Sequence, residues 1–547
     1  MQENLSPLLR ALWHKVRYRW DLVPDRGPSL LLWGPAVLVA GMVVVPMLYL
    51  LLRTLGAEQT TWELLFRLRT LQVIGRTLWL VLTVTLATAL LALLLGWLTV
   101  RTDLPGRQAW MVLTTLPLVI PSYVGAYLIV AALGPRGMLQ QWLETSIGIS
   151  RLPDIYGFPG AMLVLTLLTY PYTLLNVRTG LVRMDPALEE ASRSLGHGTW
   201  LTFYHVTLPQ LRPALTSGSL LVALYTLRDF GAVSIMRYDT FTRVIYIQYQ
   251  SAFDRAAAAA LGLILVGITL GILTLEIRMR GRARYHQGKT GASRPLPLIP
   301  LGRWRWPALL FCSTVVGMAL VLPAGVLLYW LVRGLKAGEQ LAPLWAATRN
   351  SVLVSALAAV VTVIAALPVV LLSVRRPGRV SRILEQFAYA GFALPGIVVA
   401  LALVFFGARY VPFFYQSLPM LLLAYTTLFL PQAIGAIRAS LVQIPPSLEE
   451  AARSLGRRPL EVFVTIVLPL VRPGMMAGAG LVFLTTMKEL PATLILSPLG
   501  FKTLATLIWS AVSEAFFAQA AAPALLLILT SSLPMALLLV RRHQRGG

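Results

Sequence analysis

The sequence predicts an all-α membrane protein built from two similar halves. Hydrophobic residues make up 57% of the 547 positions and charged residues only 13%, where a typical soluble domain carries roughly 25% charged residues. Long apolar runs such as 30–52, 77–100 and 257–277 reach the roughly 20 residues that a helix needs to cross a bilayer. The third observation is a segment of the first half, residues 187–213, that occurs again in the second half as residues 447–473.

We expect twelve transmembrane helices. The first apolar run is too long for the core of a signal peptide and has no obvious small-residue cleavage site, so we interpret it as a retained first span. The expected spans are 30–52, 77–100, 109–134, 159–182, 214–235, 256–277, 306–332, 350–374, 386–406, 417–437, 474–495 and 518–540.

The net charge of +25 predicts orientation rather than nucleic-acid binding. Basic residues concentrate in the stretch 278–305, in the loop after residue 374 and in the tail. With twelve spans all three fall on one side, which the positive-inside rule makes cytoplasmic together with both termini. The loop 53–76, which also carries four arginines, does not follow this rule.

The chain repeats itself. Residues 187–213 align without a gap with residues 447–473, and 13 of these 27 positions are identical. At the same offset, Arg228-Asp229 aligns with Lys488-Glu489, and Phe241 aligns with Phe501. Six spans per half is an even number, so both halves enter the membrane in the same direction, and the pseudo-two-fold axis lies along the membrane normal.

These patterns divide the chain into five parts. A longer external loop at about 135–158 distinguishes the first half from the second. The predicted parts are a cytoplasmic N-terminal segment 1–29, a first transmembrane domain 30–277, a basic cytoplasmic linker 278–305, a second transmembrane domain 306–540 and a cytoplasmic tail 541–547.

The repeated segment predicts a short amphipathic helix in the cytoplasm. Asp185 suits the N-cap and Pro186 the first helical position. Leu188, Ala191 and Leu195 then form one apolar stripe, and the following glycine offers a left-handed C-terminal stop. The second copy has the same pattern at Leu448, Ala451, Leu455 and Gly456. A helix lying on the membrane surface is the alternative, but anionic headgroups would repel the duplicated Glu-Glu pair.

The two copies resemble the signature loop of permeases in binding-protein-dependent ABC importers. That signature, Glu-Ala-Ala, then Gly, then Leu-Pro, stands as Glu190-Ala191-Ser192, Gly196 and Leu208-Pro209, with Ser192 as a departure. The second copy reads Glu450-Ala451-Ala452, Gly456 and Leu468-Pro469. The resemblance implies a type I importer permease fold and loops that couple to an ATPase, at Leu188, Glu189, Glu190, Ala191, Leu195, Gly196, Leu448, Glu449, Glu450, Ala451, Leu455 and Gly456.

The resemblance also implies partners and location. They are a homodimer of ATPase subunits, an extracytoplasmic solute-binding protein and the lipid of a bacterial inner membrane that the chain crosses many times. The fused layout and the stretches 488–493 and 501–506 are similar to ferric-iron permeases. Thiamine permeases share the layout and remain the nearest alternative. Polyamine, sulfate and phosphonate permeases fit less well because their halves are usually separate chains. The resemblance therefore implies ferric iron as the cargo, delivered by the binding protein.

Four charged residues are candidates for a translocation path or gate. Arg228, Asp229, Lys488 and Glu489 lie near the expected external ends of the fifth and eleventh spans. Charges within spans are costly and usually face a cavity or a partner. The alternative is that they mark where the span leaves the membrane. Pro117, Pro121, Pro171 and Pro395 are expected to kink their helices.

No residue pattern predicts chemistry by this chain. Gly288-Lys289-Thr290 resembles the end of a phosphate-binding loop, but Ala283 replaces the required glycine. We therefore expect no enzyme activity and no bound cofactor, with ATP used by a separate subunit. The five histidines are scattered and predict no metal site. An ion-driven transporter, whose repeats would more often be inverted, and a membrane enzyme, which would need a polar catalytic cluster, are the other classes considered.

Overall fold

The computed structural model describes residues 30–56, 62–63, 66–135, 137–149, 152–250, 255–281, 298–338, 342–391 and 394–543. All regular elements of the described part are helices, apart from one isolated β-bridge. The N-terminal segment, Gly288-Lys289-Thr290 in the linker and the last four residues lie outside it.

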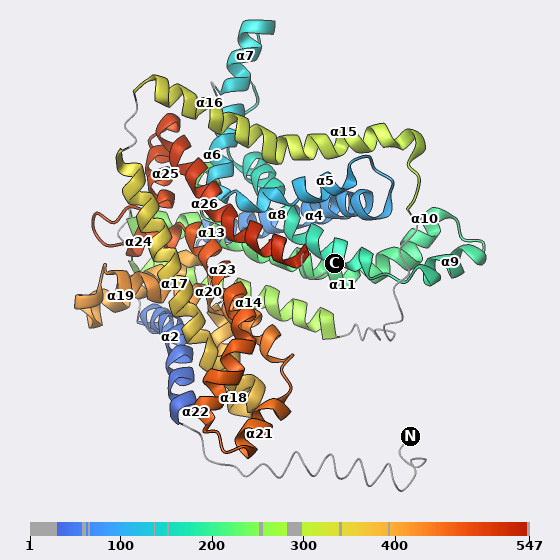
Figure 1. The fold of residues 1–547 in the computed structure, drawn as a ribbon. Helices are drawn as coiled ribbons and strands as arrows, with labels where there is room; N and C mark the ends of the chain where they lie inside the picture. Colours follow the sequence, from blue (N-terminus) through green and yellow to red (C-terminus); the bar gives the residue numbers. More distant parts are fainter. Residues whose placement is uncertain are drawn as a thin grey trace.

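The helices follow the same order in both halves (Figure 1). The first half contains α2 (Leu30–Leu55), α4 (Leu68–Arg101), α5 (Arg107–Leu113), η1 (Leu116–Val119), α6 (Ser122–Leu133), α7 (Met138–Ile147), α8 (Phe158–Val182), α9 (Pro186–Ser194), α10 (Thr199–Thr202), η2 (Phe203–Thr207), α11 (Leu208–Arg228), α12 (Gly231–Ile235), α13 (Phe241–Gln250) and α14 (Arg255–Gly281). The second half contains η3 (Gly302–Trp304), α15 (Arg305–Val316), η4 (Gly317–Val321), α16 (Leu322–Lys336), α17 (Ala342–Arg375), α18 (Arg379–Ala390), α19 (Gly396–Tyr410), η6 (Pro412–Phe414), α20 (Leu418–Leu441), α21 (Pro446–Ser454), α22 (Pro459–Val462), η7 (Phe463–Val467), α23 (Leu468–Met487), α24 (Pro491–Leu496), α25 (Leu504–Ser513) and α26 (Phe517–His543).

Helix α7 accounts for the longer loop of the first half, which the sequence predicts to be external. It projects beyond the neighbouring helices at the top of Figure 1. The second half has only η6 at the corresponding place, between α19 and α20. The predicted insertion is therefore a helix added to one half of an otherwise repeated structure.

Eight helices in the described part are long and apolar enough to cross a membrane, or nine if one bent pair is counted as a span. All twelve predicted segments contain helix, and several of them are interrupted rather than continuous. Two apolar helices, α19 (Gly396–Tyr410) and α25 (Leu504–Ser513), are shorter. Breaks within the predicted spans explain most of the difference.

Prolines produce two of these breaks. The helical stretches Arg107–Val119 and Ser122–Ser146 are bent by 100° relative to each other. Ile120, which precedes Pro121, has an extended backbone with φ −79° and ψ 121°, because a proline ring disfavours the α conformation of the residue before it. Pro395 stands at the equivalent place, directly before α19. By contrast, Pro171 lies inside the continuous helix α8.

The first helix of each half packs against the other half. Helix α2 contacts α17, α18 and α19, and α16 contacts α6. The Tyr49 ring lies edge-on to Phe406 with centroids 6.2 Å apart, and the Arg53 guanidinium lies 4.9 Å from the centre of the Phe405 ring. The two sequence repeats therefore interlock rather than forming two separate bodies.

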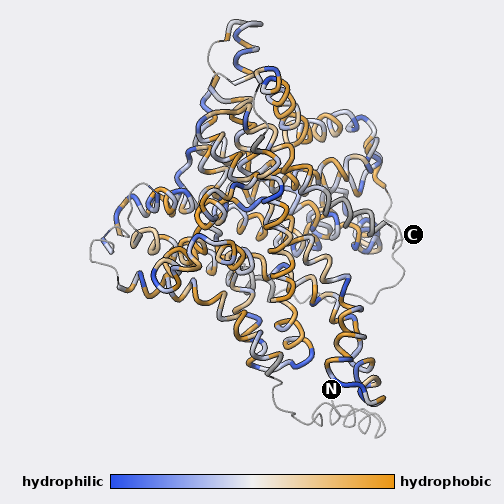
Figure 2. The backbone as a smooth tube through the Cα atoms, turned by 60° about the vertical axis from the view of Figure 1, so that its left-hand side comes forward, coloured by the Kyte–Doolittle hydropathy of each residue, from blue (hydrophilic) through white to orange (hydrophobic). Residues whose placement is uncertain are grey.

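Lipid is the expected neighbour of the outer helix faces. Leu82, Leu86 and Leu90 follow one stripe of α4 and are all more than half exposed. Figure 2 shows hydrophobic residues along most of the helical body and hydrophilic residues gathered toward loops and helix ends. Apolar side chains on these faces need no protein partner, because lipid tails solvate them as well as another helix would.

A pair of backbone contacts corrects the alignment beyond residue 229. The Phe241 N–H donates to Thr77 Oγ1 (3.2 Å), and the Leu504 N–H donates to Ser351 Oγ (2.8 Å). Phe241 and Leu504 both begin equivalent helices, α13 and α25. The predicted counterpart, Phe501, is therefore wrong, because the segment between Glu489 and α25 is three residues longer than the segment between Asp229 and α13.

Candidate functional site: two docking loops and a polar contact between the halves

The predicted loop helix in the first half is α9. Asp185 Oδ1 accepts a hydrogen bond from the Ala187 N–H at 3.0 Å, and Pro186 is the first helical residue. At the other end Gly196 has φ +85°, and the His197 N–H donates to the Ser192 carbonyl at 3.2 Å. These contacts confirm the predicted N-cap and the predicted left-handed stop.

Helix α21 repeats this geometry with one difference. Pro445 takes the N-cap position and has no side-chain hydrogen bond to give. Gly456 has φ +83°, and the Arg457 N–H donates to the Ala452 carbonyl at 3.2 Å. The second loop helix is therefore capped at its C-terminus like the first but not at its N-terminus.

The apolar stripes of both helices face away from the protein. Leu195 is 78% exposed and Leu455 84% exposed. The other stripe positions are also exposed, whereas Glu189 and Glu449 are buried on the inner face. An amphipathic helix ordinarily buries its apolar side against its own chain. Here that side lies on the surface of the chain.

Five further apolar side chains extend these surfaces, and sequence reasoning missed them. They come from the helical stretch after each glycine. Trp200 and Tyr204 lie four residues apart, as do Leu460 and Val464, and this spacing could have indicated a common face. They are Trp200, Leu201 and Tyr204 in the first loop and Leu460 and Val464 in the second. We call α9 with residues 195–204 the first docking loop and α21 with residues 455–464 the second docking loop. Figure 1 places α9 and α21 at the ends of separate groups of helices, away from α7.

The two acids of each Glu-Glu pair have different surroundings. Glu190 and Glu450 are exposed beside the apolar stripe. Glu189 instead forms a buried ion pair with Arg101, the last residue of α4. Sequence reasoning grouped all four acids together, because adjacent positions on a short helix give no indication of which one meets the membrane domain.

The four candidate gate residues lie where α11 and α23 end. Asp229 Oδ1 accepts from the Ala232 N–H at 2.9 Å, and Glu489 Oε1 accepts from the Ala492 N–H at 3.2 Å. Each acid therefore caps the short helix that follows it, α12 or α24. None of the four residues is exposed, so they do not mark a helix end that opens to solvent.

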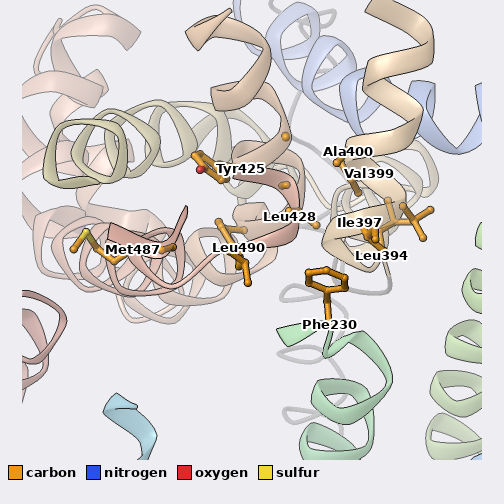
Figure 3. Close-up of a cluster of buried hydrophobic side chains, with 14 of the residues drawn as sticks. Phe230, Leu394, Ile397, Val399, Ala400, Tyr425, Leu428, Met487 and Leu490 are labelled. Atoms are coloured by element: carbon orange, nitrogen blue, oxygen red, sulfur yellow. The ribbon is translucent and has the colours of Figure 1, made fainter. Parts of the chain in front are cut away.

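These residues also join the halves. Lys488 Nζ donates to the Leu118 carbonyl in η1 at 2.8 Å, and the charges of Arg228 and Glu489 lie within electrostatic range of each other. In the same region of the sequence, Phe230 reaches from the first half toward Leu394 and Leu490 of the second (Figure 3). The structure thus brings Arg228, Lys488 and Glu489 to the contact between the halves, whereas the hydrogen bonds of Asp229 stay within the first half.

Among the described residues, no group of three or more histidine, cysteine or acidic side chains is arranged to hold a metal ion. Two histidine rings lie near each other, those of His197 in the first docking loop and His205 directly after it, with centroids 6.5 Å apart. Two such rings do not make a complete ligand set for a transition metal.

Comparison with known proteins identifies the family. The family model described as binding-protein-dependent transport system inner membrane component matches residues 89–277 and, a second time, residues 358–544. The chain belongs to this family. Both matches contain one docking loop, so the inner membrane component carries two copies of the family unit in one chain, as the sequence repeat predicts.

Several known proteins are similar in sequence to this inner membrane component, and the length of chain that they match differs. The Fe(3+)-transport system permease protein FbpB 2 of Haemophilus influenzae is 35% identical over 518 residues, which cover 94% of this chain and 98% of the relative. The ferric transport system permease protein FbpB of Actinobacillus pleuropneumoniae is 26% identical over 70% of this chain and 58% of its own length. The molybdenum transport system permease protein ModB of Escherichia coli is 31% identical over 33% of this chain and 80% of its own length.

Proposed function

We propose that this chain is the permease of an ATP-driven importer of ferric iron. The exposed apolar stripes on α9 and α21 support the proposal that ATP drives the transport. Two similar surfaces on one chain fit a pair of ATPase subunits, one for each docking loop. The relative from Haemophilus influenzae that matches 94% of this chain is named as an Fe(3+)-transport permease. This similarity supports iron as the cargo.

The proposed partners follow from this arrangement. Two copies of one ATPase subunit bind the docking loops on the cytoplasmic side, where both termini also lie. A solute-binding protein delivers iron on the opposite side of the bacterial inner membrane. The permease itself hydrolyses no ATP and holds no cofactor, so ATP acts only through the partner subunits.

The proposed mechanism is alternating access. Closure of the ATPase dimer moves the docking loops together, and the interlocked halves change their contact at the centre. Arg228, Asp229, Lys488 and Glu489 would then form the gate of the path, because three of them have a partner in the other half and Asp229 directly follows Arg228. A docking surface shifts the equilibrium only if it binds the closed and open ATPase states with different free energies.

The test is uptake by proteoliposomes that contain the permease, its ATPase and its binding protein. We expect uptake of radioactive iron that requires both ATP and the binding protein, and no uptake with a non-hydrolysable ATP analogue. Parallel assays use thiamine as the alternative cargo. Thiamine uptake without iron uptake would contradict the proposed cargo, and uptake that continues without the ATPase would contradict the proposed energy source.

A further inference from the structure

The first docking loop is fastened to the membrane domain by a buried ion pair. Arg101 ends α4 and is only 1% exposed. Its guanidinium pairs with one carboxylate oxygen of Glu189, and the other oxygen accepts a hydrogen bond from Thr207 Oγ1 at 3.0 Å. Glu189 therefore joins α9 to the end of α4 and to the end of η2.

The second docking loop is fastened in the same way. Arg375 is the last residue of α17, and its Nε lies 2.7 Å from Glu449 Oε1. Arg375 Nη2 also donates to the Ile444 carbonyl at 3.1 Å. Arg453 on the same short helix adds a longer contact to Glu449 at 3.5 Å. The two loops thus share an Arg–Glu contact between the last residue of a 34-residue helix and a docking helix.

Little else holds these docking helices to the rest of the chain. The buried residues of α9 are Glu189 and Ser192, and those of α21 are Glu449 and Ala452. An inner face this small buries little apolar surface, so hydrophobic packing contributes little there. A buried ion pair adds orientation, and removing one partner leaves the other charge buried and uncompensated.

We propose that the Arg101–Glu189 and Arg375–Glu449 pairs transmit movement of the docking loops to α4 and α17. Glu189 and Glu449 are positioning residues in this mechanism, and their neighbours Glu190 and Glu450 face the partner. The proposal rests on the proposed function, since it assumes that the docking loops bind an ATPase. In addition, it names the two ion pairs through which movement of the docking loops reaches the membrane domain.

The first pair has an additional support. The linker residue Ile299 bridges to the end of α4, where its N–H donates to the Arg101 carbonyl at 2.8 Å. Asp103 Oδ1 accepts from the Leu301 N–H at 2.8 Å. Arg375 is 17% exposed at its side chain, against 1% for Arg101. Loss of the Arg101–Glu189 pair is therefore expected to reduce uptake per ATP more than loss of the Arg375–Glu449 pair.

The test compares Glu189→Gln, Glu449→Gln and the double variant in the full transporter. We measure ATPase retained on the purified permease, iron uptake, and uptake per ATP hydrolysed. We expect the ATPase to remain bound, while uptake per ATP falls by roughly tenfold or more in the double variant. Glu189→Gln is expected to have the larger single effect.

Two controls separate coupling from general damage. Asp239→Asn breaks an ion-pair cluster with Arg76 and Arg243, which lies away from both docking loops, and is expected to leave uptake per ATP unchanged. The exchanged pair Arg375→Glu with Glu449→Arg restores opposite charges in the less buried pair. It is expected to recover part of the coupling that Glu449→Gln loses, which a role in folding alone would not predict.

The outcomes distinguish the two proposals. Normal uptake per ATP in Glu449→Gln and in the double variant, with the ATPase bound, would overturn the role of the ion pairs and leave the proposed function intact. Failure of the unaltered permease to bind any ATPase would overturn the proposed function first. If Glu189→Gln does not fold, Glu449→Gln in the more exposed pair decides the question.

Discussion

The ammonium group of Lys488 donates a hydrogen bond to the backbone carbonyl of Leu118 at 2.8 Å, across 370 positions of sequence. Leu118 belongs to η1, in the bent segment between α5 and α6. Lys488 directly follows α23 in the other half. This contact joins the two repeats where two of their helices are broken.

Replacing Lys488 by methionine removes this donor and keeps a straight side chain. A hydrogen bond to a charged group contributes about 1.5–3 kcal/mol, so the halves should be joined less firmly. We expect ATP hydrolysis without the binding protein to rise several-fold and iron uptake to fall. The matched control is Lys502→Met, whose side chain is exposed. Unchanged basal hydrolysis in Lys488→Met would show that this contact does not restrain the resting state.

The docking-loop glycines give a second prediction. Gly196 and Gly456 have φ near +85°, a conformation that costs other residues about 1–2 kcal/mol. We expect Gly196→Val combined with Gly456→Val to abolish coupled uptake while membrane insertion stays normal. Asn tolerates this backbone region better, so the paired Asn variants should retain most of the uptake. Equal uptake in the Val and Asn variants would refute a requirement for this turn.

The exposed leucines at the helix ends give a third prediction. Burial of a leucine side chain contributes about 1.5–3 kcal/mol, so Leu195→Asp and Leu455→Asp should each weaken ATPase binding by roughly tenfold to a hundredfold. Both side chains are already exposed in the free permease, so its stability should not change. Titration of the purified permease with the ATPase provides the measurement. Leu499→Asp serves as control, since Leu499 is 88% exposed in the loop after α24.

Gly396 gives a fourth prediction at the contact between the halves. A Cβ atom there would lie 2.4 Å from Glu489 Oε1, whereas the equivalent first-half residue, Ser122, hydrogen-bonds Asp229. We expect Gly396→Ala to displace Glu489 and to lower stability by about 1–3 kcal/mol, measured as a lower melting temperature. Gly262→Ala meets only ordinary contacts. A Gly396→Ala protein as stable as Gly262→Ala would show that the carboxylate moves freely.

Much of the fold could be predicted because its signals are local. Apolar runs located the helices, and Pro121 and Pro395 indicated where two of them would bend. The sequence did not predict that helices α11 and α23 end at Arg228 and Met487. Asp229 and Glu489 were interpreted as charges near the end of a membrane span. Their carboxylates instead cap α12 and α24, and that role depends on which backbone N–H groups lie nearby. The counterpart of Phe241 was misassigned for a related reason, since an insertion in a loop is visible only when the helices on both sides are paired.

The sequence by itself determined the two docking loops. Asp185, the spacing of Leu188 and Leu195, and Gly196 act within one or two helical turns, so their order along the chain is sufficient. Only the tertiary structure decided that Glu189 meets Arg101 while Glu190 stays exposed, and that Lys488 reaches Leu118. Those partners are distant in sequence, and a side chain's partner depends on how the helices pack. Local order therefore defined the docking surfaces, and packing defined how they are connected to the membrane domain.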